Sequence, residues 1–104
     1  MRWCRRLFVG DGAKSRRKKI ISRAEKGKAL NGVYLLTLPG NPRNLLDIYP
    51  EWVLMQDYFC RSEEIQVVGI AQGHEEAVML AAEILEEVCR ETGAYDTHAF
   101  FQES

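Results

Sequence analysis

The chain of 104 residues has few of the residues that build disulfide scaffolds and metal centres. Its three cysteines, Cys4, Cys60 and Cys89, are far apart and form no C-x-x-C pair, and its only histidines are His74 and His98. An odd, sparse cysteine count argues against a disulfide framework and is typical of a reducing compartment. Because neither histidine has a cysteine or the other histidine at a short ligand spacing, we expect no metal site and no cofactor.

Long apolar runs are also missing. Near the N-terminus, the apolar run of Leu7, Phe8 and Val9 ends at a Gly-Asp-Gly turn after three residues. A signal peptide needs an apolar stretch of about 7–15 residues, and a membrane-spanning helix needs about 20. We therefore expect a cytoplasmic protein without a membrane span.

Recognisable catalytic and nucleotide-binding patterns are absent as well. The segment from Gly69 to Gly73 lacks the Lys-Ser/Thr pair that completes a P-loop. His74, at a helix start, is a conceivable general base but has no evident reacting partner. Cys60 lies beside Arg61, and Cys89 borders the apolar face of a predicted helix, where a thiol is usually inert. We expect a protein that is not an enzyme.

Charge, by contrast, is abundant and unevenly divided. Residues 1–31 hold 11 of the 14 Lys and Arg residues and two acids, a formal charge of +9. Residues 32–104 hold three basic residues and 13 acids, a formal charge of −10. A cationic segment beside an anionic one needs counter-charge from nucleic acid, from an anionic surface or from the molecule itself.

Most of the basic residues fall in a segment predicted to form a helix, residues 14–27. Ser15 is a suitable N-cap, and Gly27 is a suitable C-terminal stop. The predicted apolar face is narrow, so the helix needs a docking surface in order to persist. That face consists of Ile20, Ile21 and Ala24.

The hydrophobic residues, 46% of the chain, concentrate after position 30. We therefore divide the chain into a basic N-terminal arm over residues 1–30, partly disordered or a marginal helix, and a compact domain over residues 31–104. Within the arm, residues 1–12 are predicted to be a loose tail or a short edge strand over residues 5–9.

The first part of the compact domain is predicted to contain a strand and two short helices. Residues 33–38 form a continuous apolar run of strand length that ends at Pro39-Gly40. Asn41 then has the chemistry of an N-cap, with Pro42 at the first helical position, so the pattern predicts a helix near residues 42–48. Pro50 interrupts it and starts a second predicted helix near residues 50–57.

The second part repeats the order of strand and helix. Residues 65–71 are predicted to be a strand, and residues 74–92 are predicted to form a long helix with a broad apolar face, ended by Gly93. The aromatic residues of 95–101 are expected to pack back on the core.

These elements predict a small β-α-β-α domain of the α/β (or α+β) class. The two central strands are joined by a crossover of about 26 residues, so we expect them to be parallel. Because an isolated pair of strands is only marginally stable, a third strand is expected from residues 4–9, from the C-terminal tail or from a second copy of the chain.

Parallel central strands would bring the loops that follow them, residues 37–44 and 72–75, to one edge of the sheet. One hypothesis is therefore a small-anion ligand site or a weak enzyme at that edge, beside two helix N-termini. The candidate ligand-binding residues are Thr37, Asn41, Arg43, Asn44, Gln72 and His74.

The main functional hypothesis is nucleic-acid binding by the basic arm, with aromatic support from Trp3 and Phe8. Two alternatives place the arm on acidic residues instead, either on residues 75–91 of the same chain or on the acidic body of another copy. The proposed phosphate contacts are Arg16, Arg17, Lys18, Lys19 and Arg23.

The crossover segment is rich in large side chains, which are enriched at protein interfaces. A protein partner or a second copy of the chain is therefore a further candidate for binding. The residues proposed for this contact are Tyr49, Trp52, Met55 and Tyr58.

Overall fold

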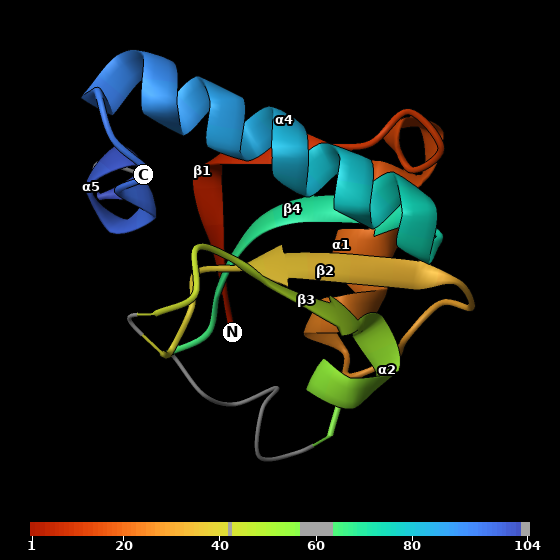
Figure 1. Ribbon diagram of the computed structural model, residues 1–104. Helices are drawn as coiled ribbons and strands as arrows, with labels where there is room; N and C mark the ends of the chain where they lie inside the picture. Colours follow the sequence, from red (N-terminus) through yellow and green to blue (C-terminus); the bar gives the residue numbers. More distant parts are fainter. Residues whose placement is uncertain (42, 57–63, 103–104) are drawn as a thin grey trace.

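The computed structural model describes residues 1–41, 43–56 and 64–102 (Figure 1). They form a mixed α/β fold. In chain order the elements are β1 (Arg2–Val9), the 3-10 turn η1 (Lys14–Arg16), α1 (Arg17–Glu25), β2 (Val33–Thr37), β3 (Asp47–Pro50), α2 (Glu51–Leu54), β4 (Gln66–Gln72), α4 (His74–Thr92) and α5 (Thr97–Phe101).

Within the described residues, four strands form one mixed sheet in the order β1-β4-β2-β3. β1 is parallel to β4, whereas β2 is antiparallel to both of its neighbours, β4 and β3. The expected third strand near residues 4–9 is therefore confirmed as β1. It is hydrogen-bonded at both ends, since the Arg2 N–H donates to the Ile65 carbonyl at 2.8 Å and the Gly10 N–H donates to the Ile70 carbonyl at 2.8 Å.

The expected parallel pairing of the two central strands is wrong. Val33 lies opposite Gln72 and Leu35 opposite Ile70, which is an antiparallel register. The cause is an additional strand in the crossover. β3 reverses the chain after β2, so β4 enters the sheet on the other side of β2 in the same direction as β3.

The helix expected near residues 42–48 is wrong for the described part of that segment, where Asp47–Pro50 forms β3. Ile48 and Tyr49 favour a pleated, half-buried surface, and Pro50 is tolerated because it ends an edge strand. The expected N-cap, Asn41, instead closes a local turn by accepting a hydrogen bond from the Arg43 N–H at 3.0 Å. Pro42 lies outside the described residues.

The second helix of the crossover is shorter than the predicted range of 50–57. α2 spans Glu51–Leu54 and directly follows Pro50. Residue 57 lies outside the described part of the chain.

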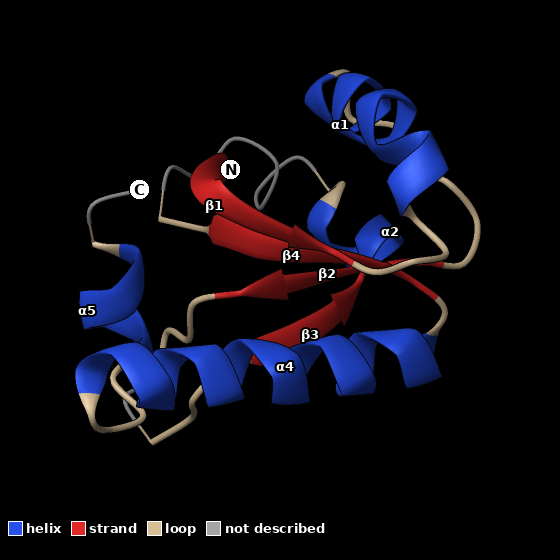
Figure 2. Cartoon of the chain, turned by 90° about the horizontal axis from the view of Figure 1, so that it is seen from above, coloured by secondary structure: helices blue, strands red, loops and turns tan. Residues whose placement is uncertain are grey.

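Helices cover both faces of the sheet (Figure 2). α4 and α5 lie on one face, and α1 and α2 lie on the other. Each face has its own buried cluster, because neighbouring residues of a strand point to opposite sides. Leu36 and Val68 belong to the cluster beneath α4, and Leu35 and Val67 belong to the cluster beneath α1.

The predicted long helix over residues 74–92 is confirmed as α4. Its buried residues recur at helical spacing, and Gly93 ends it with a left-handed backbone at φ 75°. The expected return of the C-terminal aromatics is confirmed for Phe100 and Phe101, which contact Phe8 with ring centroids 6.4 and 6.1 Å away. Tyr95 remains exposed. The buried residues of α4 are Ala77, Leu80, Ile84 and Val88.

The basic N-terminal residues contribute to the same sheet and core as the rest of the chain. Cys4 is buried beneath α4, and Ile20 and Ala24 of α1 are fully buried on the opposite side. The charge boundary near residue 31 therefore falls inside one sheet, and the expectation of a loose tail over residues 1–12 is wrong. In the part of the chain that the structure describes, no helix is both long and apolar enough to span a bilayer.

Candidate nucleic-acid interface

α1 carries the basic cluster and is held against the sheet by a few apolar side chains. Ile20 and Ala24 are four residues apart, so they lie on one side of the helix and are both buried. Ser15 is not the N-cap that was predicted, because the chain enters α1 through η1 and neither start has a side-chain cap. Gly27 does end the segment, at φ 74°, where the Gly27 N–H donates to the Ala24 carbonyl at 2.9 Å.

The outer side of α1 presents four exposed cations, Arg17, Lys18, Lys19 and Arg23. Among the described residues, none of these four takes part in an ion pair. Like charges within one or two turns of a helix repel one another, so this side of the helix is kept in water and attracts anions. We call these four residues the α1 cation cluster.

Arg16, the fifth predicted phosphate contact, has a structural role in this geometry. It is half-buried, and its guanidinium donates a hydrogen bond to Gln72 Oε1 at 2.6 Å. Gln72 Nε2 in turn donates to the Asn31 carbonyl at 3.3 Å. This network ties the start of α1 to the end of β4 and to the turn before β2.

The α1 cation cluster does not lie on the acidic helix of its own chain. α1 and α4 cover opposite faces of the sheet (Figure 2), so the predicted docking of the basic helix on residues 75–91 is wrong. The acidic helix contacts a basic residue of β1 instead. Arg6 pairs with Glu91 at 2.8 Å and lies 4.7 Å from the centre of the Phe100 ring.

Trp3 and Phe8, the predicted aromatic support, belong to the interior. Phe8 packs on the aromatic residues of α5, and half-buried Trp3 packs against the cluster beneath α1. Neither ring extends the α1 cation cluster.

The predicted ligand site at the sheet edge is divided between two ends of the sheet. Because β2 and β4 are antiparallel, Thr37 lies opposite Val67 at the start of β4, far along the strands from Gln72. Thr37, Asn41, Arg43 and Asn44 are therefore at one end, and Gln72 and His74 are at the other. Thr37 is buried, Arg43 is exposed, and Asn44 Nδ2 donates to Asp47 Oδ1 at 3.2 Å.

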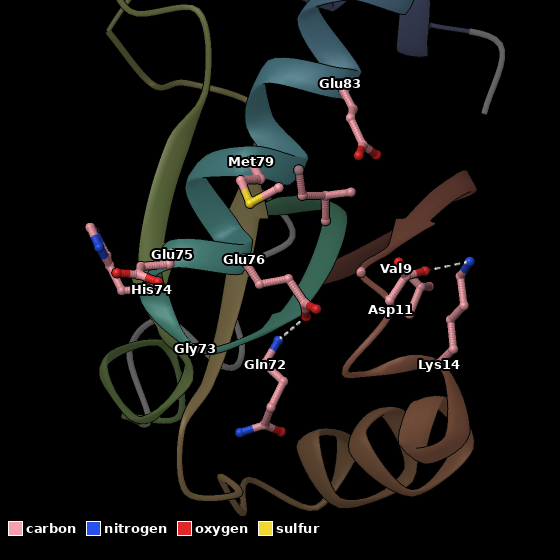
Figure 3. Close-up of a pocket in the computed structure, with 12 residues that line it drawn as sticks. Val9, Asp11, Lys14, Gln72, Gly73, His74, Glu75, Glu76, Met79 and Glu83 are labelled. Carbon is pink, nitrogen blue, oxygen red and sulfur yellow. Dashed lines mark hydrogen bonds and ion pairs between the residues drawn. The ribbon is translucent and has the colours of Figure 1, made fainter.

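A different pair of loops meets beside Gln72, because β1 and β4 are the parallel pair. Gly10 and Asp11, in the turn after β1, and the start of α4 together border a cavity of about 590 Å³ (Figure 3). Its ionisable lining is mostly acidic, with one lysine, Lys14, paired to Asp11 at 3.0 Å. The hydrogen bond from the Lys14 ammonium to the Asp11 carboxylate, together with the charge of that carboxylate, raises the pKa of Lys14. The acids of the lining are Asp11, Glu75, Glu76 and Glu83.

The carboxylate of Glu76 accepts hydrogen bonds from two backbone N–H groups beside this cavity that could otherwise bind an anion. Its Oε1 accepts from the Gly12 N–H at 2.7 Å. Its Oε2 accepts from the Gln72 N–H at 2.6 Å (Figure 3). A Cβ atom at Gly10 would lie 2.5 Å from Glu76 Oε2, so any larger residue there would displace the Glu76 carboxylate. We call this arrangement the Glu76 clamp. It joins α4 to the turn after β1 and fills with a carboxylate the place where a small anion was expected.

His74, the conceivable general base, is turned away from the clamp (Figure 3). Its ring packs edge-on against Tyr34, with centroids 5.5 Å apart. A general base needs a proton-transfer partner at hydrogen-bond distance, and this packing instead supports a role in covering the end of the sheet.

Sequence reasoning missed the buried acid Glu51. Its side chain is fully buried, and its Oε1 accepts from the Leu30 N–H at 2.7 Å. Oε2 has no hydrogen-bond partner within the part of the chain that is described. Burial raises the pKa of Glu51, and the Leu30 N–H and the charge of Arg16 oppose this rise. A glutamate directly after Pro50 carries no signal of burial in the sequence.

Of the two cysteines that the structure describes, neither lies in an arrangement suited to catalysis. Cys4 is buried, and burial raises the pKa of its thiol, which disfavours the reactive thiolate. Cys89 is half-buried, and Cys60 lies outside the described residues. Of the residues that the structure describes, no three His, Cys, Asp or Glu side chains form a cluster suited to a metal ion.

The residues predicted for a protein contact differ in their exposure to solvent. Trp52 is exposed, whereas Tyr49 and Met55 are half-buried against the cluster beneath α1. Burial and the neighbouring Asp47 raise the pKa of Tyr49, whose hydroxyl donates to Asp47 at 3.4 Å. Tyr58 lies outside the described part of the chain.

Comparison of the chain with family models, with curated proteins and with solved structures finds no match. The function is therefore inferred from the surface chemistry of the molecule itself.

Proposed function

We propose that this protein binds nucleic acid through the α1 cation cluster and acts as a small accessory protein without catalytic activity. The observation that carries the proposal is the placement of Arg17, Lys18, Lys19 and Arg23. They are exposed, and none of them is in an ion pair with another described residue. They lie on the face of the sheet opposite the acidic helix α4 (Figure 2).

The helix geometry supports contact with a phosphate backbone. α1 has nine residues and is therefore about 14 Å long, a length that matches about four nucleotides of one strand in a duplex. Burial of Ile20 and Ala24 fixes the helix on the sheet, so the four cations are distributed around the rest of its surface, which is exposed to water. Phosphate contacts of this kind give affinity with little sequence preference.

The acidic face gives the binding a direction. α4 exposes several glutamates on the far side of the sheet, and these repel a polyanion. Nucleic acid is therefore expected to approach the α1 face and not to wrap around the molecule.

The test is a titration of labelled DNA and RNA with the full chain at several salt concentrations. With about four phosphate contacts, affinity should fall about 50-fold for single strands and about 150-fold for duplex between about 50 and 200 mM salt. Affinity that does not change with salt would contradict the proposal.

A matched pair of variants locates the site. Replacing the four residues of the α1 cation cluster by Gln should weaken binding by more than about tenfold and flatten its salt dependence. The control replaces four exposed cations elsewhere, and so changes the net charge by the same amount. Equal losses in the two variants would show that net charge, and not α1, carries the binding. The control positions are Arg2, Arg5, Arg43 and Arg90.

The opposite charges of the two faces also support a second candidate, self-association. The basic face of one copy fits the acidic face of another, and such a head-to-tail contact produces open chains of molecules. Sedimentation at low and high salt distinguishes the two candidates, because salt should dissociate such chains. A monomer at every salt concentration would eliminate the second candidate.

A further inference from the structure

Trp52 is the most informative exposed ring of the described surface. Its side chain is 63% exposed, although it lies on the four-residue helix α2, where Glu51 and Leu54 are buried. Glu51 and Leu54 hold α2 against the sheet, so the indole of Trp52 is kept in water by the rigid position of its helix. A ring presented in this way is available for stacking.

Beside Trp52 lies a groove of about 420 Å³. Pro50 provides an aliphatic ring in its lining; Tyr34 also borders the groove, but its ring packs toward His74 on the α4 face. Asn31 adds an amide and backbone polar groups, which are the donors and acceptors that the edge of a nucleobase requires. The volume is at the lower end of the range for small-ligand pockets, and one planar base fits it readily. The other lining residues are Ala29, Leu30, Gly32 and Val33.

The groove continues the basic surface of α1. The chain leaves α1 through Lys26 and Lys28, both exposed, and reaches Ala29 at the rim of the groove one residue later. The hydrogen bond from the Leu30 N–H to Glu51 Oε1, 2.7 Å long, fixes this exit segment to α2. α1 and α2, the helices that carry the cation cluster and Trp52, lie on the same face of the sheet (Figure 2).

We propose that the nucleic acid bound by this protein is single-stranded, with one base stacked on Trp52 in the groove and phosphates held by Lys26, Lys28 and the α1 cation cluster. This inference rests on the proposed function. Proteins that bind single strands combine a basic track with aromatic side chains on which bases stack. In a duplex the bases are already paired and stacked, so the indole gains no base without the cost of unpairing.

The charge around the groove favours this occupant over an apolar protein segment. The segment that leads from α1 to the groove is positive through the exposed Lys26 and Lys28, and the wall of the groove includes the indole of Trp52. A polyanion with planar bases satisfies both parts, whereas an apolar segment would meet only the wall.

The experiment measures intrinsic fluorescence during titration with three probes at about 0.1 M salt: a 12-nucleotide oligothymidylate, an oligouridylate of equal length and a 12-base-pair DNA duplex. The chain has two tryptophans, Trp3 and Trp52, so a Trp3→Phe variant reports on Trp52 alone. Single strands should quench its emission, and the duplex should not. Oligothymidylate and oligouridylate distinguish DNA from RNA as the source of the strand.

Three variants separate stacking from charge. Trp52→Ala should weaken single-strand binding about 5- to 150-fold with an unchanged salt slope and unchanged duplex binding. Trp52→Phe keeps a ring and should retain most of the affinity. Met79→Ala removes an exposed apolar side chain from α4 on the other face and should have no effect. Circular dichroism and the thermal midpoint verify that each variant is folded.

The outcomes distinguish this inference from the proposed function. If no probe binds, both are overturned. If single strand and duplex bind equally, and only the α1 variant weakens binding, the proposed function stands and the stacking site is overturned. If Trp52→Ala changes the oligomeric state and leaves nucleic-acid binding intact, the groove takes a protein and the inference is overturned.

Discussion

The two faces of the sheet are covered by helices of opposite charge and unequal length. α4 has 19 residues, an apolar stripe along its inner side and glutamates along its outer side. α1 has nine residues, two buried side chains and cations along its outer side. Yet Ile20 of α1 is as completely buried as Ile84 of α4. A helix with a narrow apolar face can therefore still bury its apolar residues completely when it packs on the apolar side chains of a sheet.

The largest effect is expected from truncating one core residue on each face. Ile84→Ala and Ile20→Ala each leave a cavity in a fully buried site, so each should lower the free energy of unfolding by about 2–5 kcal/mol. Urea denaturation measures both. A loss below about 1 kcal/mol for Ile20→Ala alone would mean that the α1 face adds little to the core and that the faces differ in stability as well as in charge.

The Glu76 clamp belongs to the acidic face and should show the next largest effect. Glu76→Ala leaves the Gly12 and Gln72 N–H groups without their carboxylate, so we expect a loss of about 2–3 kcal/mol. The control is Glu75→Ala, which removes an exposed glutamate from the same turn and should change stability by less than about 0.5 kcal/mol. Thermal unfolding of the two variants compares them directly, and equal losses would contradict the clamp.

Glu51 supplies the α1 face with a dependence on pH. Burial raises its pKa in the folded protein, so the folded state binds the proton more tightly than the unfolded state does. The contribution of this group to stability is therefore present at low pH, below the ordinary pKa of glutamate, and is lost as pH rises through the raised value.

Glu51→Gln removes this titration and keeps an acceptor for the Leu30 N–H. The variant should be more stable than the parent protein at neutral pH by on the order of 1 kcal/mol. The advantage should shrink as the solution is acidified below the ordinary pKa of glutamate. Urea denaturation at several pH values measures the difference, and an advantage that grows on acidification would contradict the sign.

The smallest effect is expected at the point where basic and acidic segments touch. Arg6 and Glu91 are both about half exposed, so their ion pair should contribute less than about 1 kcal/mol. The guanidinium also lies near the Phe100 ring, which adds about 0.5 kcal/mol at an exposed site. A double-mutant cycle with Arg6→Gln and Glu91→Gln isolates the ion pair, and its coupling energy should decrease with added salt. A coupling energy that salt does not change would contradict this description.

Elements with a strong local pattern were predictable from the sequence. α4 repeats its apolar residues over five turns and begins and ends at the expected positions, and β2, β4 and the edge strand β1 were also found. β3 was not predictable, because Ile48 and Tyr49 form only a short apolar pair after the helix-start signal of Asn41. Missing that one strand reversed the expected direction of β4 relative to β2.

The candidate site was predictable only in part. The cations of α1 stand out by composition, but the face of the sheet on which they lie depends on the strand order, which no local pattern encodes. The Glu76 clamp joins residues 64 positions apart. Its local signal is a glutamate three residues after Gly73, at the position of a capping box. The groove beside Trp52 likewise needs β2, β3 and α2 to be placed first.

The strand order also sets the sequence of events in folding. β4 lies between β1 and β2, yet it is the last of the described strands along the chain. During synthesis, β1 has no hydrogen-bonding neighbour until residue 72 has emerged, although β2 and β3 can already pair as a hairpin. Arrival of β4 then joins β1 to the β2-β3 hairpin by closing long loops, a step that loop entropy slows. The most cationic third of the polypeptide therefore waits longest for its place in the sheet.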